Sequence, residues 1–135
     1  MKVFGRVLIL ALVTLQLSAC FGREQVIYSN VSRSIPASAQ SLSLAEISSV
    51  IQQTAISRNW IAKPVDDNTI RITHEIRTHM AAAEITFSQD SYKTTYVDST
   101  NLLYKGSTIH RNYNRWVRNL EQDIDIALRR AASLK

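Results

Sequence analysis

Between residues 42 and 135, apolar positions recur first with the period of a helix, then with that of a strand, and finally again with that of a helix. An apolar residue at every third or fourth position is typical of a helix with one buried face, whereas alternation is typical of a strand buried on one side. The pattern therefore predicts a helix, a group of strands and a second helix, in that order.

The first helix is predicted to begin after Ser43. Ser43 and Glu46 have the spacing of a capping box, and Leu42 and Ile47 occupy the two positions of a hydrophobic staple. We expect the helix to end near residues 58–59. One face carries the apolar residues Leu44, Ile47, Val50, Ile51 and Ala55.

Alternation predicts strands at 69–77, 83–88 and 92–97. A further strand is predicted at 60–65, where Pro64 restricts it to an edge or a strand end. The connections are too short for parallel crossovers, which need about a dozen residues. We therefore expect an antiparallel meander of three or four strands.

The final helix is predicted to run from about Thr108 to Ser133 and to be the longest element. Its apolar stripe follows steps of three or four residues: Ile109, Tyr113, Trp116, Leu120, Ile124, Ala127, Ala131 and Leu134. We expect both helices to pack on one face of the sheet, which is a layered α+β arrangement. The predicted fold is thus a single α+β domain over residues 42–135.

The start of the chain has the pattern of a secretory signal peptide. Lys2 and Arg6 precede an apolar run of eleven residues from Val7 to Leu17, which is too short to cross a bilayer of about 30 Å as a helix. We expect residues 1–19 to be cleaved off. Residues 20–41 are rich in serine without a sustained period and are predicted to be a tether. The alternative for residues 26–28 is that they add an edge strand or dock on the domain.

The sequence Leu17-Ser18-Ala19-Cys20 resembles the lipobox of bacterial lipoprotein precursors, which reads Leu, a small residue, Ala or Gly, then Cys. The resemblance implies that the Cys20 thiol receives a diacylglyceryl group, that the bond before it is cut, and that the new amine is acylated. The alternative is an ordinary signal peptide followed by a free or buried cysteine. A lone cysteine in an exported chain cannot form an internal disulfide, which favours lipidation.

Phe21 directly follows the predicted lipidation site. In lipoproteins, an Asp at this position typically retains the protein in the inner membrane. The resemblance therefore implies an outer-membrane lipoprotein whose domain faces the periplasm, in a bacterium with two membranes. In an organism with a single membrane, the domain would face outward.

The positive charge is concentrated at the end of the chain. The net charge is +5, and residues 105–135 contribute +4 of it, whereas residues 20–104 contribute −1. Arg111, Arg115 and Arg118 form a basic stripe on the final helix. An exported, anchored chain meets little nucleic acid, so the expected partners of the stripe are an envelope protein or anionic lipid. The alternative is an ordinary solvated helix face.

Motifs for enzymes and metal sites are lacking in the sequence. The glycines are too scattered for a phosphate-binding loop. His74 and His79 resemble a zinc protease pair, but three residues separate Glu75 from His79 where that motif has two, and the predicted strand would point the two imidazoles to opposite sides. We expect no metal, no cofactor and no catalytic residue, and we interpret His74 as a core histidine with a satisfied hydrogen bond.

The polar groups of the final helix show no acid–base pair. His110 and the acids Glu121, Asp123 and Asp125 are expected to lie on a solvated helix face. The run at residues 109–116 also resembles a motif of small, uncharacterised proteobacterial lipoproteins, which names no activity. In our interpretation, its aromatic residues, Tyr113 and Trp116, anchor the helix in the core.

These patterns predict a membrane-anchored lipoprotein whose small domain acts by binding, as an adaptor or structural component of the cell envelope. The alternative is a small-ligand-binding domain with a cavity between the sheet and the last helix, and an enzyme is the third possibility.

Overall fold

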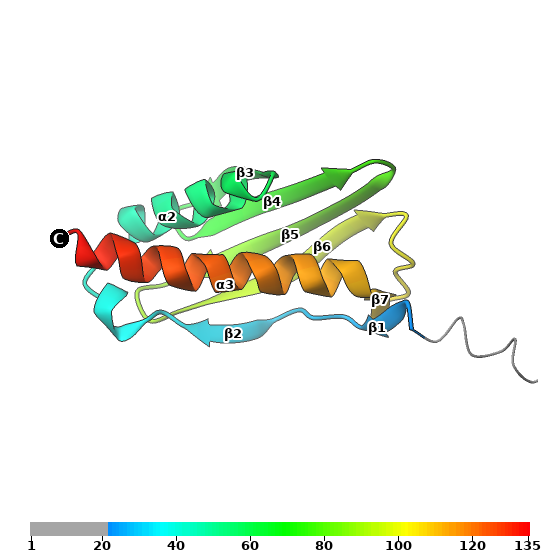
Figure 1. Ribbon diagram of the computed structural model, residues 1–135, viewed down its shortest axis with the longest axis horizontal. Helices are drawn as coiled ribbons and strands as arrows, with labels where there is room; N and C mark the ends of the chain where they lie inside the picture. The colour runs from blue at the N-terminus through cyan, green and yellow to red at the C-terminus, as the bar shows by residue number, and fades with distance from the viewer. Residues whose placement is uncertain (1–21) are drawn as a thin grey trace, which may run out of the picture.

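The computed structural model describes residues 22–135. The predicted signal peptide, the lipobox with Cys20, and Phe21 lie outside the described residues. The described chain combines two α-helices with a five-stranded and a two-stranded antiparallel sheet (Figure 1). The predicted mixture of helices and antiparallel strands, an α+β fold, is confirmed.

The larger sheet has the strand order β2-β6-β5-β4-β3. Four of its strands form a continuous antiparallel meander: β3 (Trp60–Asp66), β4 (Thr69–Ile76), β5 (His79–Phe87) and β6 (Ser91–Thr100). Pro64 lies on β3, which is an edge strand, one of the two positions predicted for it. The fifth strand, β2 (Val31–Ser34), pairs with β6 at the other edge and was not predicted.

The helix α2 (Leu44–Ser57) begins as predicted. The Glu46 N–H donates to Ser43 Oγ at 3.2 Å, and the Ser43 N–H donates to Glu46 Oε2 at 2.7 Å, which completes the capping box. The helix ends at Ser57, and Asn59 follows with a φ of +62°. Asparagine tolerates this left-handed conformation better than most residues do, so the chain can turn directly into β3.

The long helix α3 (Arg111–Ser133) begins three residues later than predicted. Residues 108–110 instead form the strand β7 (Thr108–His110), which pairs antiparallel with β1 (Glu24–Val26). The side chain of His110 then caps the helix, because its Nδ1 accepts the Asn112 N–H at 3.1 Å. The pairing with β1 therefore fixes where α3 starts.

The tether predicted for residues 20–41 is wrong over residues 24–41. This segment forms β1, β2 and a 3-10 helix, η2 (Ala37–Ala39). Ile35, Ala39 and Leu42 are buried in the core at 1%, 0% and 2% exposure. The alternative for residues 26–28 holds instead: they dock on the domain, where the Tyr28 N–H donates to Asn114 Oδ1 at 2.8 Å.

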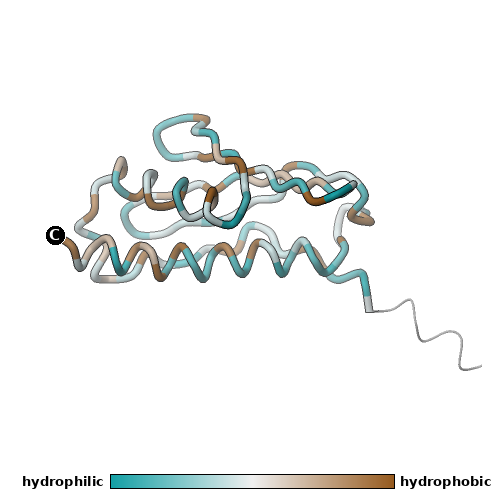
Figure 2. The backbone as a smooth tube through the Cα atoms, turned by 45° about the horizontal axis from the view of Figure 1, so that its top comes forward, coloured by the Kyte–Doolittle hydropathy of each residue, from teal (hydrophilic) through white to brown (hydrophobic). Residues whose placement is uncertain are grey.

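One core joins the helices to the larger sheet. Figure 1 shows α2 and α3 side by side in front of the sheet. Buried residues from every layer contribute to the core: Ile35, Ile47, Ile51, Trp60, Ile70, Ile72, Ile85, Tyr92, Tyr113, Leu120 and Ile124. The outer face of the sheet carries polar side chains, among them the Arg71–Glu84 ion pair. Along α3, hydrophobic and hydrophilic residues alternate (Figure 2), as expected of a helix with one buried face. Within residues 22–135, no helix is both long and apolar enough to cross a membrane.

Candidate functional site

The predicted basic stripe lies at a surface pocket. Arg111, Arg115 and Arg118 are exposed on α3 and line this pocket together with Gln25, Asn112, Asn114, Asn119 and Gln122. We call this the basic pocket. Among the described residues, no carboxylate lies within ion-pair distance of the three guanidinium groups. The structure therefore brings the three predicted residues together with amides that the sequence did not single out.

Asn114 holds the N-terminal segment against the pocket. Its side chain is 2% exposed. Its Oδ1 accepts the Tyr28 N–H at 2.8 Å, and its Nδ2 donates to the Val26 carbonyl at 2.8 Å. The Arg118 guanidinium lies over the Tyr28 ring, 4.7 Å from the ring centroid, which is a cation–π distance. Gln25 thus forms one wall of the basic pocket and α3 forms the other, while residues 26–28 are held beside it.

Behind this wall lies a buried carboxylate, Glu121, at 0% exposure. The Tyr28 hydroxyl donates to its Oε2 at 2.7 Å, and the Thr94 hydroxyl donates to its Oε1 at 2.9 Å. Burial raises the pKa of Glu121, while the hydrogen bonds from Tyr28 and Thr94 and the charge of Arg33 act against this rise. The prediction that Glu121 lies on a solvated face is wrong, because residue 121 follows Val117 by one helical turn and shares its buried side.

Asp125 extends this network toward β2. The Tyr92 hydroxyl donates to Asp125 Oδ1 at 2.7 Å, and the Arg33 guanidinium forms an ion pair with Asp125 Oδ2. Burial and the hydrogen bond to Asp125 both raise the pKa of Tyr92. Burial alone would lower the pKa of Arg33, but the hydrogen bond to Asp125 reverses this effect and raises it. Each charged group here has a partner, so the network binds the N-terminal segment and the sheet to α3.

His74 is a core residue, as predicted. Its ring stacks on Trp60 with centroids 4.8 Å apart and meets Trp116 edge-on at 5.1 Å. Its Nδ1 lies 3.1 Å from the Asn59 carbonyl. The imidazole is therefore packed among indole rings and backbone.

His79 differs from its prediction. A turn at residues 77–78 reverses the chain, so His79 begins β5 and pairs with Ile76, which places it on the same face as His74 and not on the opposite one. Its Nδ1 lies 2.6 Å from the Asn101 carbonyl. Across residues 22–135, no three or more His, Cys, Asp and Glu side chains are grouped so as to hold a metal ion.

His110 belongs to the basic end of α3. Burial lowers its pKa, and the charges of Arg111, Arg23, His79 and Arg115 lower it further. The neutral ring suits its role as a helix cap, since only an unprotonated Nδ1 can accept the Asn112 N–H. The cap therefore explains His110 without any acid–base role.

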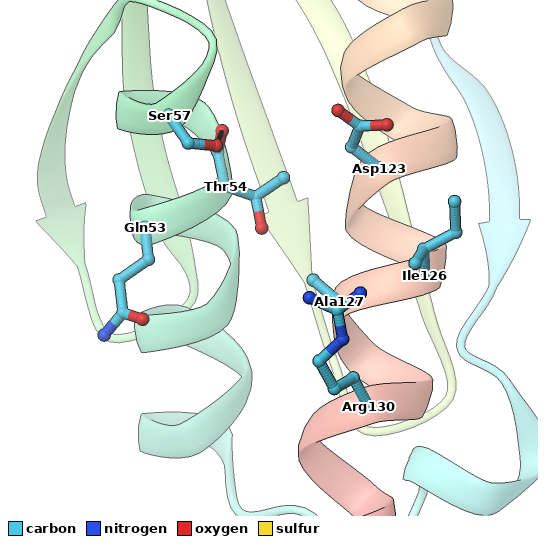
Figure 3. Close-up of a pocket in the computed structure, with 7 residues that line it drawn as sticks. All are labelled: Gln53, Thr54, Ser57, Asp123, Ile126, Ala127 and Arg130. Atoms are coloured by element: carbon cyan, nitrogen blue, oxygen red, sulfur yellow. Dashed lines mark hydrogen bonds between the residues drawn. The ribbon is translucent and has the colours of Figure 1, made fainter.

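A second pocket lies between α2 and α3 (Figure 3). It is lined by Gln53, Thr54, Ser57, Asp123, Ile126, Ala127 and Arg130. Its hydroxyls bond to helix carbonyls, Thr54 to Val50 at 2.7 Å and Ser57 to Thr54 at 2.8 Å. Asp123 forms an ion pair with Arg58. Because these hydroxyls and the Asp123 carboxylate already have partners within the protein, the basic pocket is the better candidate for binding.

The basic pocket presents N–H donors from guanidinium and amide groups on a surface that is held in place from behind. Guanidinium groups bind carboxylates and phosphates with paired hydrogen bonds, so the pocket is suited to an anionic group. The sequence revealed the three arginines by their spacing, whereas Gln25 joins them only through the β1–β7 pairing. Comparison of the chain with protein-family models, with curated protein sequences and with solved structures gives no match.

Proposed function

We propose that the protein is a membrane-anchored lipoprotein whose small domain acts by binding, as an adaptor or structural component of the cell envelope. The observation that carries this proposal is the lipobox, Leu17-Ser18-Ala19-Cys20, which follows a basic and then apolar leader. Cys20 is the lipid-bearing residue. With Phe21 after it, the anchor belongs to the outer membrane, and the domain faces the periplasm of a two-membrane bacterium.

The basic pocket supports binding as the mode of action. Among residues 22–135, no carboxylate pairs with Arg111, Arg115 or Arg118 on this face of α3, and the partner they suit is an acidic envelope protein or an anionic lipid. In this proposal α2 and α3 cover one face of the sheet, which leaves the outer side of α3 free for the partner.

The alternative, a cavity for a small ligand between the sheet and α3, has less support. Large side chains occupy this space: Tyr92 and Tyr113 are 1% and 0% exposed. The residues of the polar network, Thr94 and Glu121, fill the same layer and bond to each other. Binding at the surface therefore agrees better with the packing, and no catalytic cluster on the described chain favours an enzyme.

The anchor is tested by the intact mass of the protein purified from membranes. We expect a chain that lacks residues 1–19 and carries added acyl mass on Cys20. Cys20→Ser should leave an uncleaved, unacylated precursor. The matched control combines Cys20→Ser with Gly22→Cys, which moves the thiol two residues out of the lipobox and should not restore acylation. A wild-type chain with a free Cys20 thiol would overturn the proposal.

The binding surface is tested by reversing its charge. We expect Arg111, Arg115 and Arg118 changed together to Glu to abolish the adduct formed in cells by a photo-crosslinker at residue 122, on the rim of the basic pocket. The control reverses Arg129 and Arg130, which lie exposed on the same helix beyond the basic pocket. An adduct that survives the first set of changes, or is lost equally with the control, would assign the partner to another surface.

A further inference from the structure

One end of the domain, which we call the anchor end, brings together segments from across the chain. It comprises β1, the turn at residues 77–78, the loop at residues 101–107, β7 and the first turns of α3. The Arg111 N–H donates to the Arg23 carbonyl at 2.7 Å, and the Asn101 side chain donates to Thr78 Oγ1 at 3.0 Å. In Figure 1 this end lies at the right, opposite the C-terminus.

The loop at residues 101–107 exposes apolar side chains at this end. Leu103 and Tyr104 are 47% and 44% exposed, and the neighbouring β1 adds Val26 at 77%. Leu103 has a φ of +55°, a conformation that Gly and Asn tolerate but that strains a leucine. The chain thus keeps a large apolar side chain in water, at a position that disfavours it.

The residues on both sides of Leu103 are held by contacts with the domain. Leu102 is buried, and its carbonyl accepts the His110 N–H at 2.7 Å. The Tyr104 ring stacks on Tyr96 with centroids 4.2 Å apart. The exposed side chain of Leu103 is therefore presented from a fixed support.

Basic residues lie at the same end of the domain as this apolar loop. Arg23, Arg77, Arg111 and Arg115 are exposed, and among the described residues none of them has a carboxylate within ion-pair distance. The nearby acids are Glu24, which pairs with Lys105 at 2.9 Å, together with Glu75 and Asp98. These positive charges also act on a group inside the domain. Burial is the largest cause of the lowered pKa of His110, and the charges of Arg111, Arg23, His79 and Arg115 lower it further.

The position of Cys20 indicates which surface the anchor end faces. Cys20 precedes Arg23 by three residues, and three residues span at most about 10 Å. Arg23 is bonded in turn to the start of α3. If Cys20 carries acyl chains in a bilayer, the anchor end is held close to the surface of that bilayer.

We propose that the anchor end docks on the bilayer that holds the lipid anchor, with Leu103 and Tyr104 in the headgroup layer and Arg23, Arg111 and Arg115 against anionic lipid phosphates. This inference rests on the proposed lipidation of Cys20. Exposed apolar side chains and arginines at one end of a domain suit such an interface, because the side chains leave water while the charges meet phosphate. The docking holds the domain in one orientation, with the far end of α3 away from the membrane.

The experiment uses the acylated protein reconstituted in vesicles. Cys20 is the chain's only cysteine, so in the acylated protein a Leu103→Cys thiol is free for a polarity-sensitive fluorophore. In phosphatidylcholine vesicles that contain phosphatidylglycerol, we expect the emission of the fluorophore to shift to the blue and its quenching by aqueous iodide to fall. Without phosphatidylglycerol, both changes should be weaker. The matched control is Leu134→Cys, 82% exposed at the opposite end, which should stay accessible in both vesicles.

Two further variants make the outcome decisive. Arg111→Gln with Arg115→Gln should remove the dependence on phosphatidylglycerol. Leu103→Asn should leave the melting temperature unchanged or raised, since Asn tolerates the positive φ, and should restore iodide access to a label at residue 104. A label at residue 103 that is as accessible as one at residue 134 would overturn the docking.

The lipid anchor and the docking are tested by separate measurements. The acyl mass, measured on the same preparation, reports the anchor alone. An acylated chain with an accessible residue 103 would overturn the docking but keep the lipoprotein. A chain without acyl mass would overturn the lipoprotein and, with it, the docking. Protection at residue 103 that is already present in detergent without vesicles would indicate a protein contact and would also overturn the docking.

Discussion

The hydroxyl of Tyr28 donates a 2.7 Å hydrogen bond to the carboxylate of Glu121, which lies 93 positions later in the chain. Glu121 is fully buried and Tyr28 is half-buried, so this bond lies where the N-terminal segment meets the interior. It joins the segment before α2 to the middle of α3. The N-terminal segment is therefore a structural part of the domain, and the following predictions begin there.

Ile35→Ala should lower the free energy of unfolding by about 2–4 kcal/mol, because it deletes buried methylenes from a packed core. Ile35 is 1% exposed. The control is Val31→Ala in the same segment, at 44% exposure, which should cost less than about 1 kcal/mol. Urea denaturation monitored by circular dichroism measures both. Equal, small losses of unfolding free energy in the two variants would indicate that the segment is the tether that the sequence suggested.

Tyr113→Phe should leave the stability unchanged or raise it by up to about 1 kcal/mol, since its hydroxyl is buried without a partner among the described residues and is costly to desolvate. Tyr92→Phe is the matched change. It removes a hydroxyl that donates to Asp125 at 2.7 Å, and it should cost about 1–3 kcal/mol. Thermal denaturation of the pair compares them directly. A loss at Tyr113 as large as that at Tyr92 would mean that the Tyr113 hydroxyl has a bonded partner.

Glu121 should make the protein less stable as the pH rises above about 4.3, the ordinary pKa of a glutamate. Burial raises the pKa of Glu121 in the folded state, so over this range the folded chain binds more protons than the unfolded chain, and its stability falls as the pH rises through the raised value. Denaturation of the wild type and of Glu121→Gln at a series of pH values isolates the effect as their difference. A difference that does not vary with pH would contradict the raised pKa.

Glu46 should act in the opposite direction. Hydrogen bonds from Lys135 and from the Ser43 N–H lower its pKa to about 2. The contribution of Glu46 to the folding stability is therefore fully present above its pKa in the unfolded chain, about 4.3. This contribution is lost as the pH falls from there toward the pKa of Glu46 in the folded chain. Glu46→Gln should reduce the acid sensitivity of unfolding between these limits. If the two proteins lose stability in parallel on acidification, the capping carboxylate is not responsible.

Local patterns predicted the local features of the fold. The capping box at Ser43 and Glu46 and the alternation along β4 were both found where expected. Each depends on residues within a few positions of one another, so short-range spacing is sufficient to reveal it.

The missed features depend on distant partners. Residues 31–34 have no strand pattern of their own and become β2 because the edge of β6 offers unpaired backbone groups. Thr108 to His110 leave the helical pattern because β1 pairs with them from more than 80 positions away. Glu121 looked like a surface acid because its partners, Tyr28 and Thr94, come from other elements.

For the candidate site, the sequence predicted which residues carry the positive charge, but it did not predict that these residues line a pocket. The spacing of Arg111, Arg115 and Arg118 on one helix placed them on one side. The wall that turns this stripe into a pocket comes from Gln25, in a segment that the buried Asn114 holds against α3 through Val26 and Tyr28. Asn114 follows Tyr113 by one position and precedes Val117 by three, and this polar residue on the apolar side of a helix was the available signal for such a contact.

The β1–β7 pairing also determines how the domain responds to pulling force. The first paired residue of β1, Glu24, lies opposite the last residue of β7, His110, and α3 follows directly. A load applied through the chain before Gly22, with α3 held in place, therefore acts on the ladder at one end and opens its bonds one after another, not all at once. This two-stranded sheet should consequently yield under tension before the five-stranded sheet does, and the bond between the Arg23 carbonyl and the Arg111 N–H should be the first to break.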